Sequence, residues 1–115
     1  MEQPTPLEQT DGFGASRIPG GLAVSGAIDM ATWAALAGVL GDLAAGDGVA
    51  GEVVLDLTEV TFIDSHGVEL IAQAARGLDG GRLLVVRGAP LPMLRIADIL
   101  HLDQEPRLAI EGPPA

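Results

Sequence analysis

The sequence predicts a single α/β domain, in which a mixed sheet of four to five strands with an N-terminal hairpin and a parallel centre packs against α-helices. Apolar runs of strand length alternate with segments whose apolar residues recur every three or four positions, as on one face of a helix. The length of 115 residues is that of one ordinary domain. We expect tails at residues 1–12 and 112–115 and one domain between them, at 13–111.

The first half of the chain predicts a tail, a hairpin and a helix. Residues 1–12 mix proline, threonine and acidic residues without periodicity, which is typical of a flexible tail. Two apolar runs at 13–18 and 22–28 flank a Pro-Gly-Gly turn and predict a hairpin. A helical period starts at Met30, with Trp33 on its apolar face and Asp29 as its expected N-cap, and Gly-Asp-Gly at 46–48 should end that helix.

The second half predicts strand and helix in alternation. The apolar run at 52–57 is expected to be the central strand, covered on both faces. Further strands are expected at 82–86 and 107–110, with a short helix at 93–100 between them. The helix that follows residue 64 should bury one apolar face. The residues of that face are Val68, Ile71, Ala72, Ala75 and Leu78.

Composition excludes several functions. With 16 acidic and 6 basic residues the net charge is −10, so we expect no binding to nucleic acid or to a membrane surface, and a partner with a basic face. All the basic residues are arginine, which removes Walker A loops and catalytic lysines, and the absence of cysteine removes thiol chemistry. We expect no metal or cofactor with only two histidines, and a cytoplasmic location without a signal peptide or membrane helix.

A polar triplet, Asp64-Ser65-His66, marks the junction between an apolar strand and a helix. A serine at a helix start can cap the backbone amides, and the same helix end favours a phosphate, so both roles stay open for Ser65. Asp64 could orient the serine hydroxyl or help a kinase take its proton, or could simply stabilise the helix dipole. Thr58 and Thr61 are alternative hydroxyl acceptors.

The other polar residues allow structural and hydrolytic interpretations. Asp29 and Asp56 favour structural roles, one capping a helix and the other bonding a neighbouring loop, although Asp29 could lie on a binding face. Neighbours in sequence rarely meet as nucleophile and base, and no G-x-S-x-G elbow surrounds Ser65. Only His101 remains as another base, so we expect no enzyme activity.

The order of strand, Asp-Ser pair, Gly67 and apolar helix resembles the STAS domain of anti-sigma factor antagonists. The matching residues are Leu55-Asp56-Leu57 and Val60-Thr61-Phe62-Ile63-Asp64-Ser65. Further matches at 26–29 and 100–103 extend the resemblance over residues 13–111 and imply a STAS fold. Two residues depart from the family pattern: His66 replaces a small residue, and His101 replaces a glycine.

The resemblance implies a phosphorylation switch. In such antagonists the serine of the Asp-Ser pair accepts phosphate from an anti-sigma factor that is a serine kinase, and a PP2C-type phosphatase removes it. Carried over, Ser65 is the phosphorylation site of a protein that regulates a sigma factor and hence transcription. The implied partner-binding residues are Asp29, Asp64, Ser65, His66, Gly67 and Glu69. The alternative is a constitutive STAS scaffold or sensory subunit of a stress-signalling assembly or lipid-transport machine, with Ser65 only a helix cap.

Overall fold

The computed structural model describes residues 6–10, 12–45, 51–78 and 81–113. They form one six-stranded sheet with the order β1-β2-β3-β4-β5-β6. The strands are β1 (Pro6–Thr10), β2 (Phe13–Ile18), β3 (Gly21–Ile28), β4 (Glu52–Ile63), β5 (Leu83–Arg87) and β6 (Leu108–Ile110). The helices are α1 (Trp33–Ala45), α2 (Ser65–Arg76), α3 (Leu91–Ile99) and the short 3-10 helix η1 (Leu102–Gln104).

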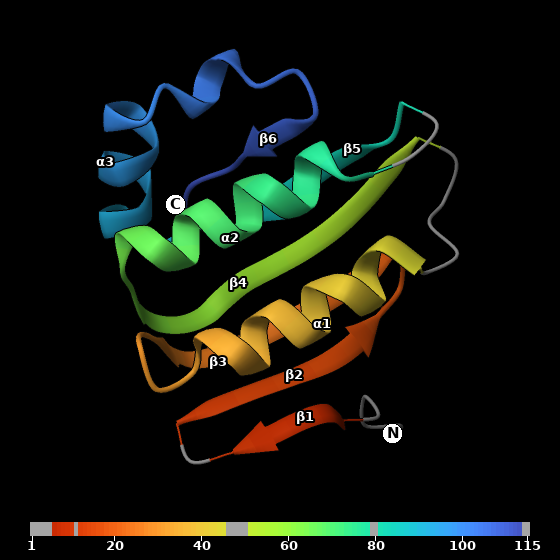
Figure 1. Cartoon of the computed structure of the whole chain (residues 1–115), viewed down its shortest axis with the longest axis vertical. Coiled ribbons are helices and arrows are strands. Elements are labelled where there is room, and N and C mark those ends of the chain that lie inside the picture. The colour runs from red at the N-terminus through yellow and green to blue at the C-terminus, as the bar shows by residue number, and fades with distance from the viewer. Residues whose placement is uncertain (1–5, 11, 46–50, 79–80, 114–115) are drawn as a thin grey trace.

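The topology places the long helices on one face of the sheet. β1, β2 and β3 pair antiparallel, whereas β3, β4, β5 and β6 pair parallel and in sequence order. Since parallel crossovers are right-handed, successive crossovers that advance in one direction put their helices on the same side. Figure 1 shows α1 and α2 side by side across that face, with α3 next to α2, and η1 contacts α3. The expected mixed α/β fold with an N-terminal hairpin and a parallel centre is therefore confirmed.

Burial along β4 alternates. Val53, Leu55 and Leu57 are buried beneath the helices, whereas Val54 and Asp56 between them are only half-buried. The expectation that this strand is covered on both faces is wrong, because all the crossover helices lie on one side. The run reads as continuously apolar, but its two faces differ in exposure.

Two other details differ from the sequence-based expectations. The sheet has six strands instead of four to five, because residues 6–10 of the expected tail pair with β2 as β1. The helix expected from Met30 begins at Trp33, after a turn. The helix stop expected at 46–48 lies outside the described residues.

The apolar face expected for α2 is confirmed. Val68, Ile71, Ala72 and Ala75 are buried against the sheet, and Leu78 is buried just beyond the helix end at Gly77. Val68 and Ile71 have no exposed surface. This packing fixes α2 along its length, so that the position of its first turn is determined by the end of β4.

Candidate functional site

The site lies at the carboxyl ends of two neighbouring parallel strands. Ile28, the last residue of β3, is aligned with Ile63, the last residue of β4. Asp29 and Asp64 follow them directly, and the backbone N–H of Asp64 donates to the carbonyl of Ile28 at 3.1 Å. Because carboxyl ends of parallel strands meet at one edge, the starts of both long helices come together here.

Asp64 is the N-cap of α2. Its Oδ1 accepts a hydrogen bond from the backbone N–H of Gly67 at 2.9 Å. The indole N–H of Trp33 on α1 donates to the same carboxylate, with Nε1 at 3.0 Å from Oδ1 and 3.1 Å from Oδ2. The carboxylate is therefore held by two partners from two helices. This geometry assigns Asp64 a structural role as cap and anchor, and it removes the cap role from Ser65.

Ser65 is the first residue of α2, and it is exposed. Within the described part of the chain, its hydroxyl has no hydrogen-bond partner, and neither its backbone N–H nor that of His66 has an acceptor. Asp64 occupies the N–H of Gly67, so two amides at this helix start remain open. The site thus offers an accessible hydroxyl beside unpaired N–H donors at the positive end of a helix.

Trp33 and His66 form a contact that periodicity alone did not predict. Trp33 was assigned to the apolar face of α1, and it is half-buried as that assignment requires. Its ring also lies against the exposed imidazole of His66, with ring centroids 4.2 Å apart and a tilt of 54°. The available signal was a tryptophan four residues after the aspartate that follows a strand, but the partners of this tryptophan, Asp64 and His66, lie about thirty residues further along the chain.

Asp29 belongs to a closed hydrogen-bonded turn. Its Oδ1 accepts from the N–H of Ala31 at 3.0 Å, and its own N–H donates to Oγ1 of Thr32 at 3.0 Å. The hydroxyl of Thr32 in turn donates to the carbonyl of Ala27 at 2.9 Å. The structure therefore uses Asp29 to cap the turn at 30–32, and the first residue of α1 is Trp33, not Met30.

Two further residues from the expected partner-binding set lie in different environments. Gly67 is buried, and a Cβ atom there would lie 2.6 Å from Cγ2 of Ile28 and 3.0 Å from Cγ1 of Ile63. Gly67 therefore serves close packing of α2 against the strand ends. Glu69 is exposed, and it lies one turn after Ser65 on the same helix face.

An apolar groove flanks the site on the side of α3. Phe62 and Leu91 line it and are 47% and 61% exposed, which is unusual for large apolar side chains. Asp64 and Arg95 are its charged members, and Arg95 forms no ion pair with any described residue. Met30, two residues after the end of β3, is 77% exposed. Large exposed apolar side chains therefore occur at the ends of neighbouring strands or shortly after them.

Comparison with known proteins identifies the family. A family model described as "Mlab, STAS domain" matches residues 12–111. The chain is a STAS domain. No functionally curated protein matches it.

A solved structure agrees with this assignment. The STAS domain is similar to an anti-sigma factor antagonist from Mycobacterium paratuberculosis, with 31% sequence identity and a TM-score of 0.61. The match covers 93% of this chain and 86% of that chain. The resemblance noted from the Asp-Ser pair and its flanking elements is therefore confirmed at the level of family and fold.

The remaining candidate residues of the STAS domain lie apart from the helix start. Asp56 Oδ1 accepts from the N–H of Thr58 at 2.9 Å, so it bonds within its own strand instead of a neighbouring loop. Thr58 and Thr61 are exposed on β4. Among the described side chains, no hydrogen bond joins Ser65 to His66 or His101.

No group of three or more histidine and acidic side chains in the described residues is arranged to hold a metal ion. The helices in the described ranges are too short or too polar to cross a membrane.

At the far end of α2, Nε of Arg76 donates to Oε2 of Glu105 at 2.9 Å, and this hydrogen bond lowers the pKa of Glu105. That ion pair fastens α2 to the segment after η1.

Proposed function

We propose that this STAS domain is an anti-sigma factor antagonist, a non-catalytic binding module that binds an anti-sigma factor serine kinase through the start of α2 and is released by phosphorylation of Ser65. The observation that carries the proposal is the exposed, unbonded hydroxyl of Ser65, held beside a fixed Asp64. The similarity to an anti-sigma factor antagonist supports the choice of partner.

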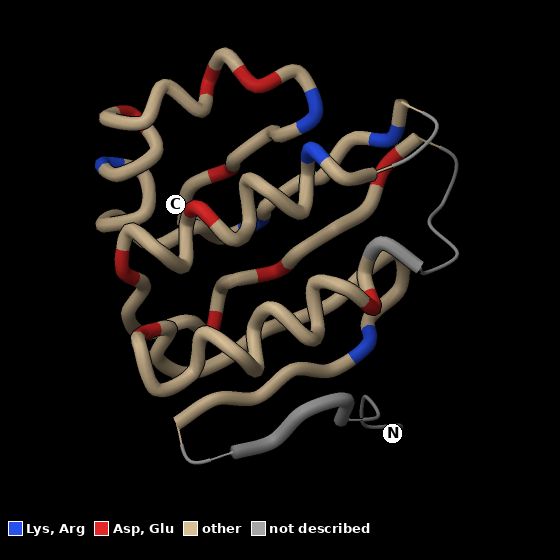
Figure 2. Tube along the Cα trace, in the orientation of Figure 1, with Lys and Arg blue, Asp and Glu red and all other residues tan. Residues whose placement is uncertain are grey.

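The charges around Ser65 favour a switch that needs no unfolding. A phosphate adds about −1.5 to −2 charges at neutral pH, beside Asp64 and one turn from Glu69. The open N–H groups of Ser65 and His66 can receive it, so the helix start tolerates the modified residue. Figure 2 shows acidic residues spread over helices, strands and connections, in a chain whose net charge is −10. Phosphate therefore adds to an existing negative field.

A partner that fits the unmodified surface loses contact when this charge appears. The exposed side chains of Phe62, Leu91 and Met30, at the ends of neighbouring strands or shortly after them, are suited to an apolar partner surface that covers the serine. A phosphate buried there without a counter-charge would face desolvation and like-charge repulsion, which cost several kcal/mol. We propose that a PP2C-type phosphatase restores the binding-competent form in the cytoplasm.

The absence of catalysis by this chain is part of the proposal. His66 contacts Trp33 and forms no hydrogen bond to Ser65, so the described geometry supplies no activated nucleophile. Asp64 already accepts from Gly67 and Trp33, which makes it a poor proton acceptor for Ser65. The chemistry on Ser65 therefore comes from the kinase. We propose that the kinase recognises Asp29, Asp64, Ser65, His66 and Glu69 of this domain, and that Gly67 allows the close packing that positions the helix start.

Calorimetry with the cognate kinase tests this proposal. The kinase is first isolated from native lysate as the protein that this domain retains and that ATP releases. Ser65→Ala should retain the affinity of the unmodified domain, whereas Ser65→Asp should weaken binding on the order of a hundredfold, because the added charge is desolvated at the interface.

Thr61→Asp is the matched control, since it adds the same charge at an exposed hydroxyl of β4 outside the helix start. Equal affinities of Ser65→Asp and Ser65→Ala would rule out the switch. Equal losses for Ser65→Asp and Thr61→Asp would show that net charge, not this site, controls binding.

The second candidate is a constitutive scaffold or sensory subunit of a larger complex, such as a stress-signalling assembly or lipid-transport machine. The groove formed by Phe62 and Leu91 favours it, because that groove is open to a partner whether or not Ser65 is modified. In this case Ser65→Asp would leave binding unchanged, while Phe62→Ser and Leu91→Ser would abolish it. Ser65 would not be a cap in either case, since Asp64 fills that role.

A further inference from the structure

The last strand of the sheet has one side without a partner. Among the described residues β6 pairs with β5 alone, in parallel. The N–H of Leu84 donates to the carbonyl of Arg107 at 2.8 Å, and the N–H of Glu111 donates to the carbonyl of Val86 at 2.7 Å. In a parallel ladder, every second residue of a strand faces the same neighbour. Residues 107, 109 and 111 therefore face β5.

The backbone N–H and C=O groups of the two residues between them, Leu108 and Ile110, point away from β5. Leu108 uses its N–H in a bond to the carbonyl of Glu105 at 3.2 Å, which leaves its carbonyl at the open edge. Ile110 presents both its N–H and its carbonyl there. A row of backbone groups of this kind is a template for an added strand.

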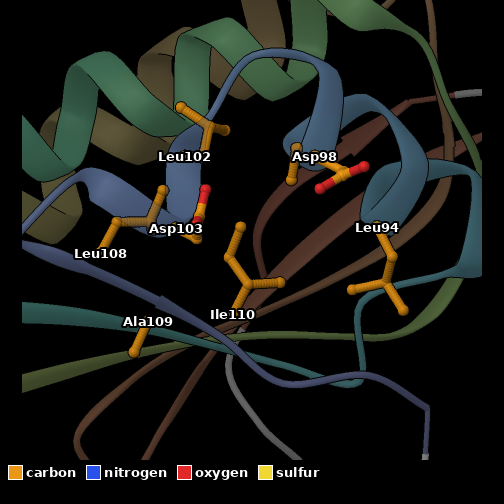
Figure 3. Close-up of a pocket in the computed structure, with 8 residues that line it drawn as sticks. Leu94, Asp98, Leu102, Asp103, Leu108, Ala109 and Ile110 are labelled. Atoms are coloured by element: carbon orange, nitrogen blue, oxygen red, sulfur yellow. The ribbon is translucent and has the colours of Figure 1, made fainter.

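A groove runs beside this edge, between β6 and the segment formed by α3 and η1. Its apolar part includes Leu94, Leu102 and Ile110, and Asp98 and Asp103 are its charged members. Figure 3 shows Ile110 between the residues from η1 and the residues from α3. The carboxylates of Asp103 and Asp98 thus lie on different sides of Ile110.

The charges of the groove are uncompensated. Asp98 and Asp103 are both exposed, and neither forms an ion pair or a side-chain hydrogen bond with a described residue. None of the described residues that line the groove is basic. An anionic or purely apolar occupant would leave both carboxylates without a partner, whereas a cationic one matches them.

We propose that the open edge of β6 binds an extended, cationic peptide segment of a partner protein as an additional strand. The backbone of the segment pairs with Ile110 and Leu108, and one apolar side chain enters the groove beside Leu94 and Leu102. Residues two positions before and after it point to the same face, about 6.8 Å away on each side. Arginine or lysine at those positions meets Asp98 and Asp103. This surface lies apart from the start of α2, so it adds to the proposed function and does not depend on it.

Binding of a defined peptide tests this surface. The probe is the capped peptide Arg-Thr-Val-Thr-Arg with a fluorophore, titrated with the full chain and followed by anisotropy. Asp98→Asn and Asp103→Asn should each weaken binding about two- to fivefold, as expected for exposed ion pairs. Asp42→Asn, which removes the same charge from the exposed side of α1, should leave the affinity unchanged.

The hydrogen bonds of the added strand need their own controls. Two N-methylated peptides are compared, each with one of the two sets of alternate amides blocked. Their affinities for the domain should differ, and the peptide that cannot pair with β6 should bind about tenfold more weakly. In the saturated complex, hydrogen exchange at the N–H of Ile110 should slow at least about tenfold. Ser65→Asp should change none of these results, which separates this proposal from the phosphorylation switch.

Several results would overturn the proposal. Absence of saturable binding would do so, as would equal binding of both N-methylated peptides. Unchanged exchange at Ile110 would exclude strand addition. A loss of peptide affinity for Asp42→Asn as large as that for Asp98→Asn would show that the peptide is attracted to the acidic protein in general and not to this groove.

Discussion

The two long helices begin in similar sequence contexts but in different physical states. Both starts follow aligned strand ends and an aspartate, Asp29 before α1 and Asp64 before α2. Near α1 the hydroxyl belongs to Thr32, which is 6% exposed and bonded to both Asp29 and Ala27. Near α2 the hydroxyl belongs to Ser65, which is exposed and has no partner in the described part of the chain. One hydroxyl maintains the fold, and the other is available to a second protein.

The aspartates show the same contrast in a different form. Among the described residues, the carboxylate of Asp29 bonds only to the backbone N–H of Ala31 in its own turn, whereas the carboxylate of Asp64 joins its own helix to Trp33 of the other helix. Capping of α2 by Asp64 is what leaves the neighbouring serine free. The comparison shows that the hydroxyl of Ser65 can stay exposed because Asp64 caps the helix in its place.

Asp64→Ala should have the largest effect on stability. It removes the cap of α2 and the charged acceptor of the Trp33 indole, which together contribute about 2–3 kcal/mol. Urea unfolding measures the loss, and the fluorescence of Trp33, the one tryptophan of the chain, should change in the folded state. Asp29→Ala is the matched control and should cost about 1 kcal/mol or less. Equal losses would contradict the role of Asp64 as a link between the helices.

Thr32→Val should have the next largest effect. Valine keeps the shape of the side chain but removes the acceptor for the N–H of Asp29 and the donor to Ala27. Leaving these partly buried groups without partners should cost about 1–2 kcal/mol in urea unfolding. Thr61→Val on the exposed side of β4 is the control, and a similar cost there would show that β-branched packing, not hydrogen bonding, is being measured.

The ends of the helices also differ, and this difference predicts a substitution that increases the stability of the domain. α2 ends at Gly77 with φ of −85°, whereas α3 is followed by His101 in the left-handed region with φ of 56°. A side chain in that region is strained, and glycine is not. His101→Gly should therefore stabilise the domain by about 1 kcal/mol in thermal or urea unfolding. His101→Ala should not stabilise it, because alanine retains the Cβ atom.

Much of the fold could be predicted because local patterns determine it. Alternating strand and helix periods predicted the hairpin, the parallel centre and the buried face of α2, and the abrupt change of pattern at Ser65 indicated the candidate site. β1 was missed because Pro6–Thr10 has no apolar period, and its pairing with β2 is a tertiary effect. The cap is Asp64 instead of Ser65, because both residue types are good caps and only the hydrogen bond from Gly67 distinguishes them.

The side-chain contacts between the two helix starts could not be predicted in the same way. The bond between Trp33 and Asp64 joins residues 31 positions apart, and periodicity carries no information about such a pair. Both residues had sufficient local explanations, one as part of an apolar face and the other as a dipole-stabilising carboxylate. His66, which had no explanation in the sequence, is now placed against the ring of Trp33.

Ser65→Ala should have the smallest effect on stability, and it is the sharpest test of the comparison between the two helix starts. Its hydroxyl has no partner among the described residues and is not the cap, so unfolding free energy should stay within about 0.5 kcal/mol of the parent domain. Asp64→Ala serves as the contrasting variant one residue away. A loss near 1 kcal/mol for Ser65→Ala, the usual cost of removing a cap, would return Ser65 to a structural role. An unchanged stability combined with complete loss of kinase-dependent labelling would assign its hydroxyl to the partner alone.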